Sequence, residues 1–124
     1  MNGYYIAAYI SLEVERMTLD GYDGERVLFH YDVSGAARSV AARVCQIVFG
    51  QRRSDGPSGE VHETPGFIHR PGVVWIGQSV LVLPPKDATE LASRLRRMGV
   101  KVAMGPVGIS REILRTFVRL YEGR

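Results

Sequence analysis

Apolar and polar residues alternate along several short segments of the chain, a pattern typical of strands. The clearest is segment 26–33, which has the sequence RVLFHYDV. Its odd-numbered apolar side chains fall on one face, whereas Leu28, His30 and Asp32 fall on the other. Further strands are predicted at 4–15, 73–76, 79–83 and 100–104. Two Asp-Gly turn signals lie within residues 19–24, between the first two predicted strands.

Apolar residues at helical spacing predict three helices, at 36–49, from about 87 to 98, and at 110–122. Ser34 and Ser110 are candidate N-caps. Asp87 and Glu90 have the spacing of an N-terminal capping box. Between the first helix and the next strand, residues 51–72 are rich in Gly, Pro, Ser and charge. We therefore expect a long loop there, either functional or mobile.

The order of elements from residue 26 onward is strand, helix, strand, strand, helix, strand. This order predicts an α+β fold with a ferredoxin-like βαββαβ core at 26–104, interrupted by the loop insertion 51–72. Residues 1–25 form an N-terminal strand and turn extension and 105–124 a C-terminal helix, all within a single domain of 124 residues. The core places 26–33 in the middle of the sheet, whereas the Asp-Gly turns favour a hairpin with 4–15. The placement of the N-terminal strand stays open.

Composition favours a cytoplasmic protein. No apolar run approaches the ~20 residues that span a bilayer, and the N-terminus lacks the pattern of a signal peptide. The single cysteine, Cys45, has no disulfide partner in the chain and is expected to pack as a small hydrophobic residue. Asn, Gln and Cys are scarce, which is typical of a thermophile.

The net charge of +3 is distributed unevenly, because residues 86–124 hold nine basic and four acidic side chains. Arginine outnumbers lysine fourteen to two, which suits phosphate recognition, although genome composition can produce the same bias. Three arginine clusters favour nucleic acid as a partner over a merely solvated surface. They are the C-terminal stripe Arg111, Arg115 and Arg119, the helix-end group Arg94, Arg96 and Arg97, and the loop group Arg52, Arg53 and Arg70.

Several short motifs follow one another in a familiar order. HYDVSG closes the strand 26–33, the next helix bears Arg38 and Arg43 and ends in FGQRR, and QSVLVLPP precedes a capped helix. Over residues 26–104 the chain resembles the Cas-two family, CRISPR-associated proteins of spacer acquisition. Relatives of that family include VapD-type ribonucleases and the C-terminal domain of the phenylacetate-degradation repressor. The segment 51–72, the N-terminal strand and the C-terminal helix depart from the family pattern.

The resemblance implies a nucleic-acid-binding homodimer, with Arg38 and Arg43 among the binding residues. It further implies that the Asp32 carboxylates of two subunits face each other and hold Mg²⁺ or Mn²⁺ for phosphodiester cleavage. Such a pair needs a cation or a shared proton to relieve its repulsion. Apart from the resemblance, His30 is a second catalytic candidate, as a ligand or proton carrier, because it shares a face with Asp32. His62, Glu63 and His69 would add to the metal site if the loop folds over the sheet, although their spacing matches no established zinc pattern.

Each of these roles has a plainer alternative. Asp32 is equally suited to bonding the backbone N–H groups at the start of the following helix. A lone histidine on a strand is more often a packing residue, which favours packing for His30. Trp75, a candidate for base stacking, is better suited to the core because it lies within VVWIG. Whether the chain is an enzyme stays open.

Two further hypotheses differ from a nucleic-acid-binding metal-dependent endonuclease. One is a non-catalytic ferredoxin-like binding or regulatory module that acts through protein partners or a small ligand. The scarcity of catalytic groups favours this alternative, since the chain has three His and no phosphate-cradling glycine motif. The other is a structural protein of a virus or mobile element, without chemistry of its own.

Overall fold

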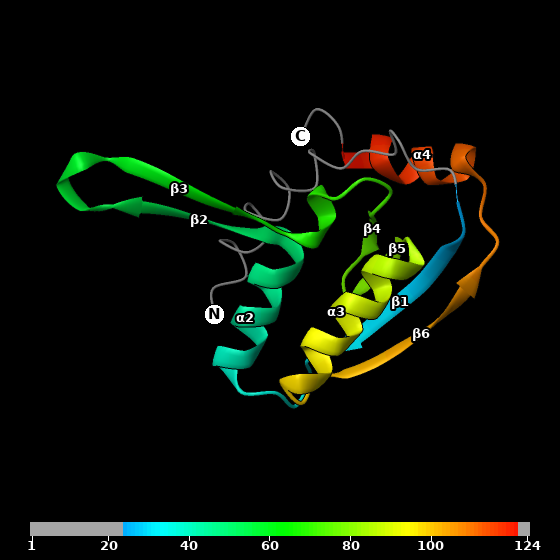
Figure 1. Ribbon diagram of the computed structural model, residues 1–124, viewed down its shortest axis with the longest axis horizontal. Helices are drawn as coiled ribbons and strands as arrows, with labels where there is room; N and C mark the ends of the chain where they lie inside the picture. Colours follow the sequence, from blue (N-terminus) through cyan, green and yellow to red (C-terminus); the bar gives the residue numbers. More distant parts are fainter. Residues whose placement is uncertain (1–23, 122–124) are drawn as a thin grey trace.

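The computed structural model describes residues 24–121 and has a mixed α+β architecture (Figure 1). The predicted strand at 4–15 lies outside the described residues. Three helices are present, α2 (Arg38–Phe49), α3 (Pro85–Arg97) and α4 (Arg111–Tyr121). The strands are β1 (Arg26–Asp32), β2 (Gly50–Asp55), β3 (Glu60–Pro65), β4 (Val74–Gly77), β5 (Val80–Leu83) and β6 (Lys101–Val107), with two short 3₁₀ helices, η1 (Gly56–Ser58) and η2 (Phe67–His69). None of the helices within residues 24–121 has the length and apolar character that crossing a bilayer requires.

Four strands form an antiparallel sheet in the order β4-β5-β1-β6. The strand β1 is central, as expected for 26–33, with β5 on one side and β6 on the other. Helices α2 and α3 lie together on one side of the sheet, whereas α4 packs at the far end of the molecule against β4 (Figure 1). The chain therefore presents two separate helical surfaces.

The two faces of β1 differ as its sequence predicts. On the side of α2 and α3, Phe29 is fully buried and Tyr31 is 5% exposed. On the other side, Leu28 is 44% exposed and His30 and Asp32 are also exposed. Alternation of burial along a strand is expected when one face of a sheet meets the core. Asp32 therefore does not sit inside the core, although its strand does.

The core fills the space between the sheet and the two helices. Its fully buried members include Phe29, Phe67, Ile68, Leu81, Leu83, Leu91 and Leu95. Cys45 lines the core and is partly buried, and burial raises the pKa of its thiol. Trp75 is also partly buried against the core, with its ring 5.7 Å from that of Phe49 and 4.9 Å from that of Tyr121. These contacts place Trp75 in an aromatic cluster rather than on an open stacking platform.

The prediction of a loop at 51–72 is wrong. The strands β2 and β3 pair in register from Gly50 opposite Pro65 to Asp55 opposite Glu60, and η2 follows them. The resulting hairpin projects away from the rest of the molecule (Figure 1). Sequence periodicity missed it because the hairpin has no core-facing side: every residue of β3 is exposed, so no alternation of apolar and polar residues is required.

Two predicted helix starts are also wrong. The helix α2 begins at Arg38, and Ala37 occupies the N-cap position without a side-chain bond, so Ser34 is not its cap. The helix α3 begins two residues before Asp87, at Pro85 behind Pro84, since proline is well suited to the first turn of a helix. Asp87 and Glu90 form no capping box. By contrast, the Ser110 hydroxyl accepts a hydrogen bond from Ile113 N–H (3.1 Å) and begins α4 as predicted.

The remaining boundaries shift by a few residues. The two strands predicted at 73–76 and 79–83 are β4 and β5, each starting one residue later. The last strand is longer than predicted, because β6 continues to Val107, opposite Arg26. The core therefore extends past 104, and α4 starts only at Arg111.

Two glycines join the hairpin to the body. Gly50 has a φ of 96°, and a Cβ there would lie 2.8 Å from the carbonyl oxygen of Thr64. A Cβ at Gly66 would clash with the backbone of Gly50 and Phe49. The Gly66 N–H donates a hydrogen bond to Nδ1 of His69 (3.0 Å). Backbone therefore crosses backbone at the base of the hairpin, and this fixes where the hairpin leaves the molecule.

We expect Gly66→Ala to lower the free energy of unfolding by about 2 kcal/mol or more, because the atoms in the way belong to backbone that cannot move aside cheaply. Gly35→Ala is the matched control, since a Cβ there meets nothing within 4 Å, and it should change stability by less than about 0.5 kcal/mol. Urea unfolding followed through the fluorescence of Trp75 measures both. Equal stability of the two variants would contradict this account of the hairpin base.

Candidate functional site

The end of β1 presents a carboxylate to solvent. Asp32 Oδ1 accepts a hydrogen bond from the backbone N–H of Ser34 (2.8 Å). Hydrogen bonds from the Ser34 side chain and backbone lower the pKa of Asp32, and the charges of Lys101 and His30 add to this effect. Asp32 is therefore ionised near neutral pH and holds the turn that leads toward α2. Asp32 thus binds the backbone of this turn and not the first N–H groups of α2, which was the alternative considered from the sequence.

Asp32 stands opposite Lys101 in the pairing of β1 with β6. Both side chains line a small hollow of about 260 Å³, together with Ser34, Gly35, Ala36 and Gly99. A carboxylate beside an ammonium group can hold a hard cation on one side and a phosphate oxygen on the other. His30 lies two residues from Asp32 on the same exposed face of β1. The two catalytic candidates are thus neighbours.

The other metal-binding candidates lie elsewhere. His62 and Glu63 are on β3, where His62 Nε2 is 3.8 Å from a carboxylate oxygen of Glu60. His69 is bonded to the base of the hairpin. Asp32 precedes α2 and the hairpin follows it, so the helix, about 18 Å long, separates them. The hairpin does not fold over the sheet, so the condition under which His62, Glu63 and His69 would add to a metal site at Asp32 is not met. No group of three or more His, Cys, Asp or Glu able to hold a metal occurs within residues 24–121.

Arg70 makes the strongest set of polar contacts near the helices. Its Nη1 lies 3.0 Å from Asp87 Oδ1, and its Nη2 lies 2.6 Å from Glu90 Oε2. The guanidinium also stands over the ring of Phe67, 3.9 Å from its centre. The hydrogen bond from Arg70 lowers the pKa of Glu90. Arg70 thus links η2 to α3 and is committed to these two acids, instead of being available for phosphate as its loop cluster suggested.

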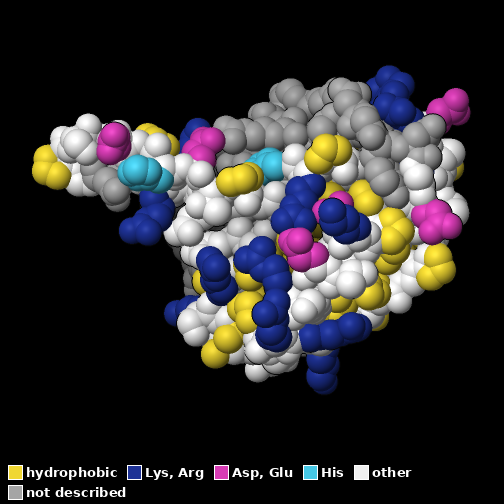
Figure 2. Space-filling view, in the orientation of Figure 1, with side chains coloured by type: hydrophobic (Ala, Val, Ile, Leu, Met, Phe, Trp, Pro, Cys, Tyr) yellow, Lys and Arg dark blue, Asp and Glu magenta, His cyan; other side chains and the backbone are white. Residues whose placement is uncertain are grey.

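This pairing leaves a basic surface on the two helices. The helix α2 contains no acidic residue, and the acids of α3 are Asp87 and Glu90. Figure 2 shows Lys and Arg side chains gathered over α2 and α3, with acidic side chains beside them near the centre of the view and others on the hairpin and at the right-hand edge. We call this surface the basic face and define it by Arg38, Arg43, Lys86, Arg94 and Arg97.

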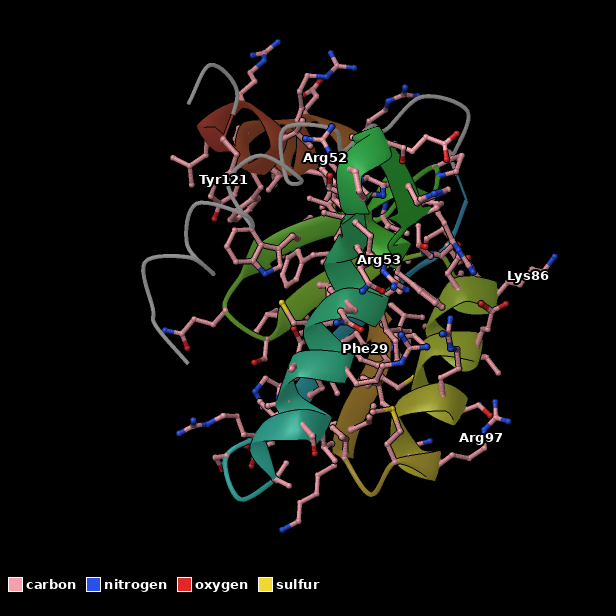
Figure 3. The ribbon with its side chains drawn as sticks, turned by 90° about the vertical axis from the view of Figure 1, so that its left-hand side faces the viewer. Phe29, Arg52, Arg53, Lys86, Arg97 and Tyr121 are labelled. Carbon is pink, nitrogen blue, oxygen red and sulfur yellow. The ribbon has the colours of Figure 1, made fainter. Side chains whose placement is uncertain are left out.

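The two hairpin arginines of the predicted set differ. Arg52 and Arg53 are consecutive on β2, so their side chains lie on opposite faces of the hairpin (Figure 3). Arg52 Nη2 forms an ion pair with Glu63 Oε1 (2.6 Å). Arg53 forms no ion pair with any side chain that the structure describes. Of the two, Arg53 is the one left to bind a phosphate.

The predicted stripe on α4 belongs to a different surface. Arg115 and Arg119 are exposed and Arg111 is partly buried, while Leu114 and Val118 bury the opposite side of the helix. The helix α4 contacts β4 and lies away from α2 and α3 (Figure 1). The α4 arginines therefore lie apart from the two helices that carry Arg38, Arg43 and the α3 arginines.

The hydrogen bonds and charges around Asp32 lead to a prediction about the pKa of its carboxyl group. We expect its pKa to lie below the ordinary value of about 3.9, and Ser34→Ala to raise it toward that value by removing the side-chain bond. Because the pKa of the folded state is the lowered one, this bond stabilises the fold above the unfolded-state pKa, and the contribution is lost as the pH falls through the folded-state pKa. Carboxyl NMR titration measures both pKa values. A raised pKa in the wild-type protein would contradict the prediction and would instead indicate two carboxylates held together.

Comparison with known proteins gives no relative for this chain. No family model matches it, and neither the curated proteins nor the solved structures contain a significant match. Its function is therefore inferred from the arrangement of its own residues.

Proposed function

We propose that the protein binds nucleic acid through the basic face of α2 and α3 and that it acts as a homodimer. One observation carries the first part: the two acids on these helices are both paired with Arg70. The charges of Arg94 and Lys86 also help to lower the pKa of Glu90, so part of the α3 charge is offset. The helix α2 carries no acid, however, and the basic face keeps an excess of positive charge. A surface of this kind attracts phosphates at a distance and releases bound counterions on contact.

The type of cation favours phosphate over a generic acidic partner. Four of the five residues that define the basic face are arginines, whose planar fork matches the oxygens of a phosphate. Arg53 on the neighbouring hairpin extends the same charge. Contacts of this type track the sugar–phosphate backbone and carry little sequence information. We therefore infer binding that depends strongly on salt and weakly on sequence.

The sheet order β4-β5-β1-β6, with two helices on one side, supports a ferredoxin-like core as part of the proposal. A distant relation to the Cas-two family is consistent with this core and with an aspartate at the end of the central strand. The hairpin of β2 and β3 and the helix α4 stand where that family has neither. Homodimerisation enters the proposal through this resemblance.

We expect the double variant Arg38→Ala/Arg43→Ala to weaken binding to duplex DNA or RNA severalfold, because it removes two cations from the basic face. The slope of log affinity against log salt should become less steep by about 1 to 2. Fluorescence anisotropy at several salt concentrations measures both quantities.

The matched control is Arg115→Ala/Arg119→Ala, which removes two exposed arginines from α4. It should leave the affinity within about twofold of wild type, since we place the binding surface elsewhere. If the α4 variant loses as much affinity as the α2 variant, binding is not localised on the basic face. If the wild-type protein binds neither duplex, the proposal is wrong.

Phosphodiester cleavage is a second candidate function, and the neighbouring charges of Asp32 and Lys101 favour it. Mg²⁺ is commonly held by one or two carboxylates together with substrate phosphates and water. Asp32 supplies one carboxylate, and Lys101 is placed to contact a phosphate at the same hollow. A bound Mg²⁺ or Mn²⁺ would activate water and stabilise the charge of the transition state. His30 is near enough along β1 to take part in proton transfer.

Asp32→Asn tests this candidate, because it removes the charge and nearly preserves the shape. If the wild-type protein cleaves nucleic acid with Mg²⁺ or Mn²⁺, the variant should lose at least about a hundredfold in rate while keeping its affinity for nucleic acid. Cleavage that survives in Asp32→Asn, or that persists in EDTA, would rule out this role for Asp32.

A further inference from the structure

Among the strands of residues 24–121, β6 forms one edge of the sheet, and the hydrogen bonds of β1 give the direction of its backbone groups. Tyr31 N–H donates to the carbonyl oxygen of Ser79 (3.1 Å), so Tyr31 directs its backbone groups toward β5. The direction alternates along a strand, so His30, one residue earlier, bonds to Ala103 of β6. The even-numbered residues of β6 therefore direct their backbone groups away from β1, toward solvent.

These outward groups are Val102, Met104 and Pro106, and they are only partly available. Arg96 Nη2 donates to the carbonyl oxygen of Val102 (3.3 Å). Pro106 has no N–H to donate. The N–H and carbonyl of Met104 have no partner among residues 24–121. Within the described part of the chain, the groups of this edge without a partner are thus the N–H of Val102, both groups of Met104, and the carbonyl of Pro106.

The free donors and acceptors of one β6 edge match those of a second copy of the same edge. When two copies of β6 run antiparallel with Met104 opposite Met104, the two methionines exchange both of their hydrogen bonds. Val102 then stands opposite Pro106, so the N–H of Val102 meets the carbonyl of Pro106. The missing N–H of Pro106 costs nothing, because the carbonyl that it would have met is already bonded to Arg96.

The two neighbouring symmetric registers are worse. When the pair is centred on Ala103, the N–H of Met104 faces the carbonyl of Val102 in the other copy, which already accepts a hydrogen bond from Arg96. Centring it on Gly105 leaves the Met104 carbonyl facing Pro106, which has no donor. An unpaired buried carbonyl costs about 1 to 3 kcal/mol. Pro106 and Arg96 therefore select a single register, and they also discourage other chains from adding to this edge.

In such a pair, the side chains of β6 that face the helices can be buried in a groove beside α3. Met104 pairs with Phe29 in the sheet, so it points to the side of α2 and α3. It is 41% exposed and lines an open groove of about 760 Å³ beside α3. Pro85, Ala88 and Thr89 form the helical wall of this groove. A second β6 would place its own Met104 and Pro106 along this largely apolar wall and bury both.

We propose that two copies of the chain pair through β6, with Met104 at the twofold axis, to form a continuous eight-stranded sheet. This proposal deepens the homodimer part of the proposed function and is independent of nucleic-acid binding. Both pairs of α2 and α3 lie on the same side of the joint sheet, so the two basic faces form one longer surface. The Asp32 residues, opposite Lys101 in each copy, lie at opposite ends of the paired strands and share no metal in this dimer.

The first test is the oligomeric state of the full chain by sedimentation velocity over a range of concentrations. We expect a reversible dimer, and Met104→Lys should raise its dissociation constant at least about tenfold by placing two like charges at the twofold axis. Ile113→Lys is the matched control, because Ile113 is an exposed apolar residue (53%) on α4, and it should leave the dimer unchanged. Circular dichroism shows whether each variant stays folded.

The second test fixes the register by cross-linking in a Cys45→Ala background. Met104→Cys should form a disulfide-linked dimer under mild oxidation, because paired residues of this type have Cα atoms about 5.5 Å apart. Val102→Cys should form no such dimer, since residue 102 of one copy lies opposite Pro106 of the other and the two introduced thiols stay apart.

Cross-linking of Asp32→Cys in place of Met104→Cys would overturn the β6 pairing and leave a homodimer that meets through the other face of the sheet. A monomer at every concentration would overturn both the pairing and the homodimer. Neither result bears on binding by the basic face, which the variant Arg38→Ala/Arg43→Ala measures separately.

Discussion

The contacts of Arg70 join the end of the hairpin segment to α3 and decide where negative charge remains on the helices. Arg70 directly follows the short helix η2. Its guanidinium stacks on Phe67 and bonds to Asp87 and Glu90 in the first half of α3. Because the group is partly exposed, its contribution to stability is modest, about 1 kcal/mol. Its larger effect is local. It holds the segment after the hairpin against α3, and it neutralises the two acids that would otherwise lie among the arginines of the helices.

Three further groups of charges lie on separate surfaces. The basic face lies over α2 and α3, the Asp32 and Lys101 pair lies at the end of β1, and the exposed arginines of α4 lie at the far end of the molecule. Pairing through β6 would double the basic face and keep the two Asp32 carboxylates apart. In the proposed dimer the joined basic face would suit binding along a nucleic-acid backbone, and no metal would be shared at the twofold axis.

Sequence patterns predicted the elements that touch the core and missed those that do not. The strand β1 and the helix α3 bury one regular face each, so their periodicity is visible in Phe29 and Tyr31 and in Leu91 and Leu95. The hairpin of β2 and β3 buries neither face and leaves no such signal. The same limit applies to the site. Asp87 and Glu90 have the spacing of a cap, but their partner is Arg70, seventeen residues before Asp87, and no local pattern records a contact of that kind.

The central claim is that nucleic acid lies along α2 and α3, and mapping the contact residue by residue tests it most directly. Two-dimensional NMR of the labelled protein, titrated with a short duplex at low salt, reports which backbone and arginine side-chain N–H groups respond. The account predicts changes concentrated in Arg38–Phe49 and Pro85–Arg97, which disappear when salt is added. Changes confined to Arg111–Tyr121, or their absence at saturating duplex, would contradict it.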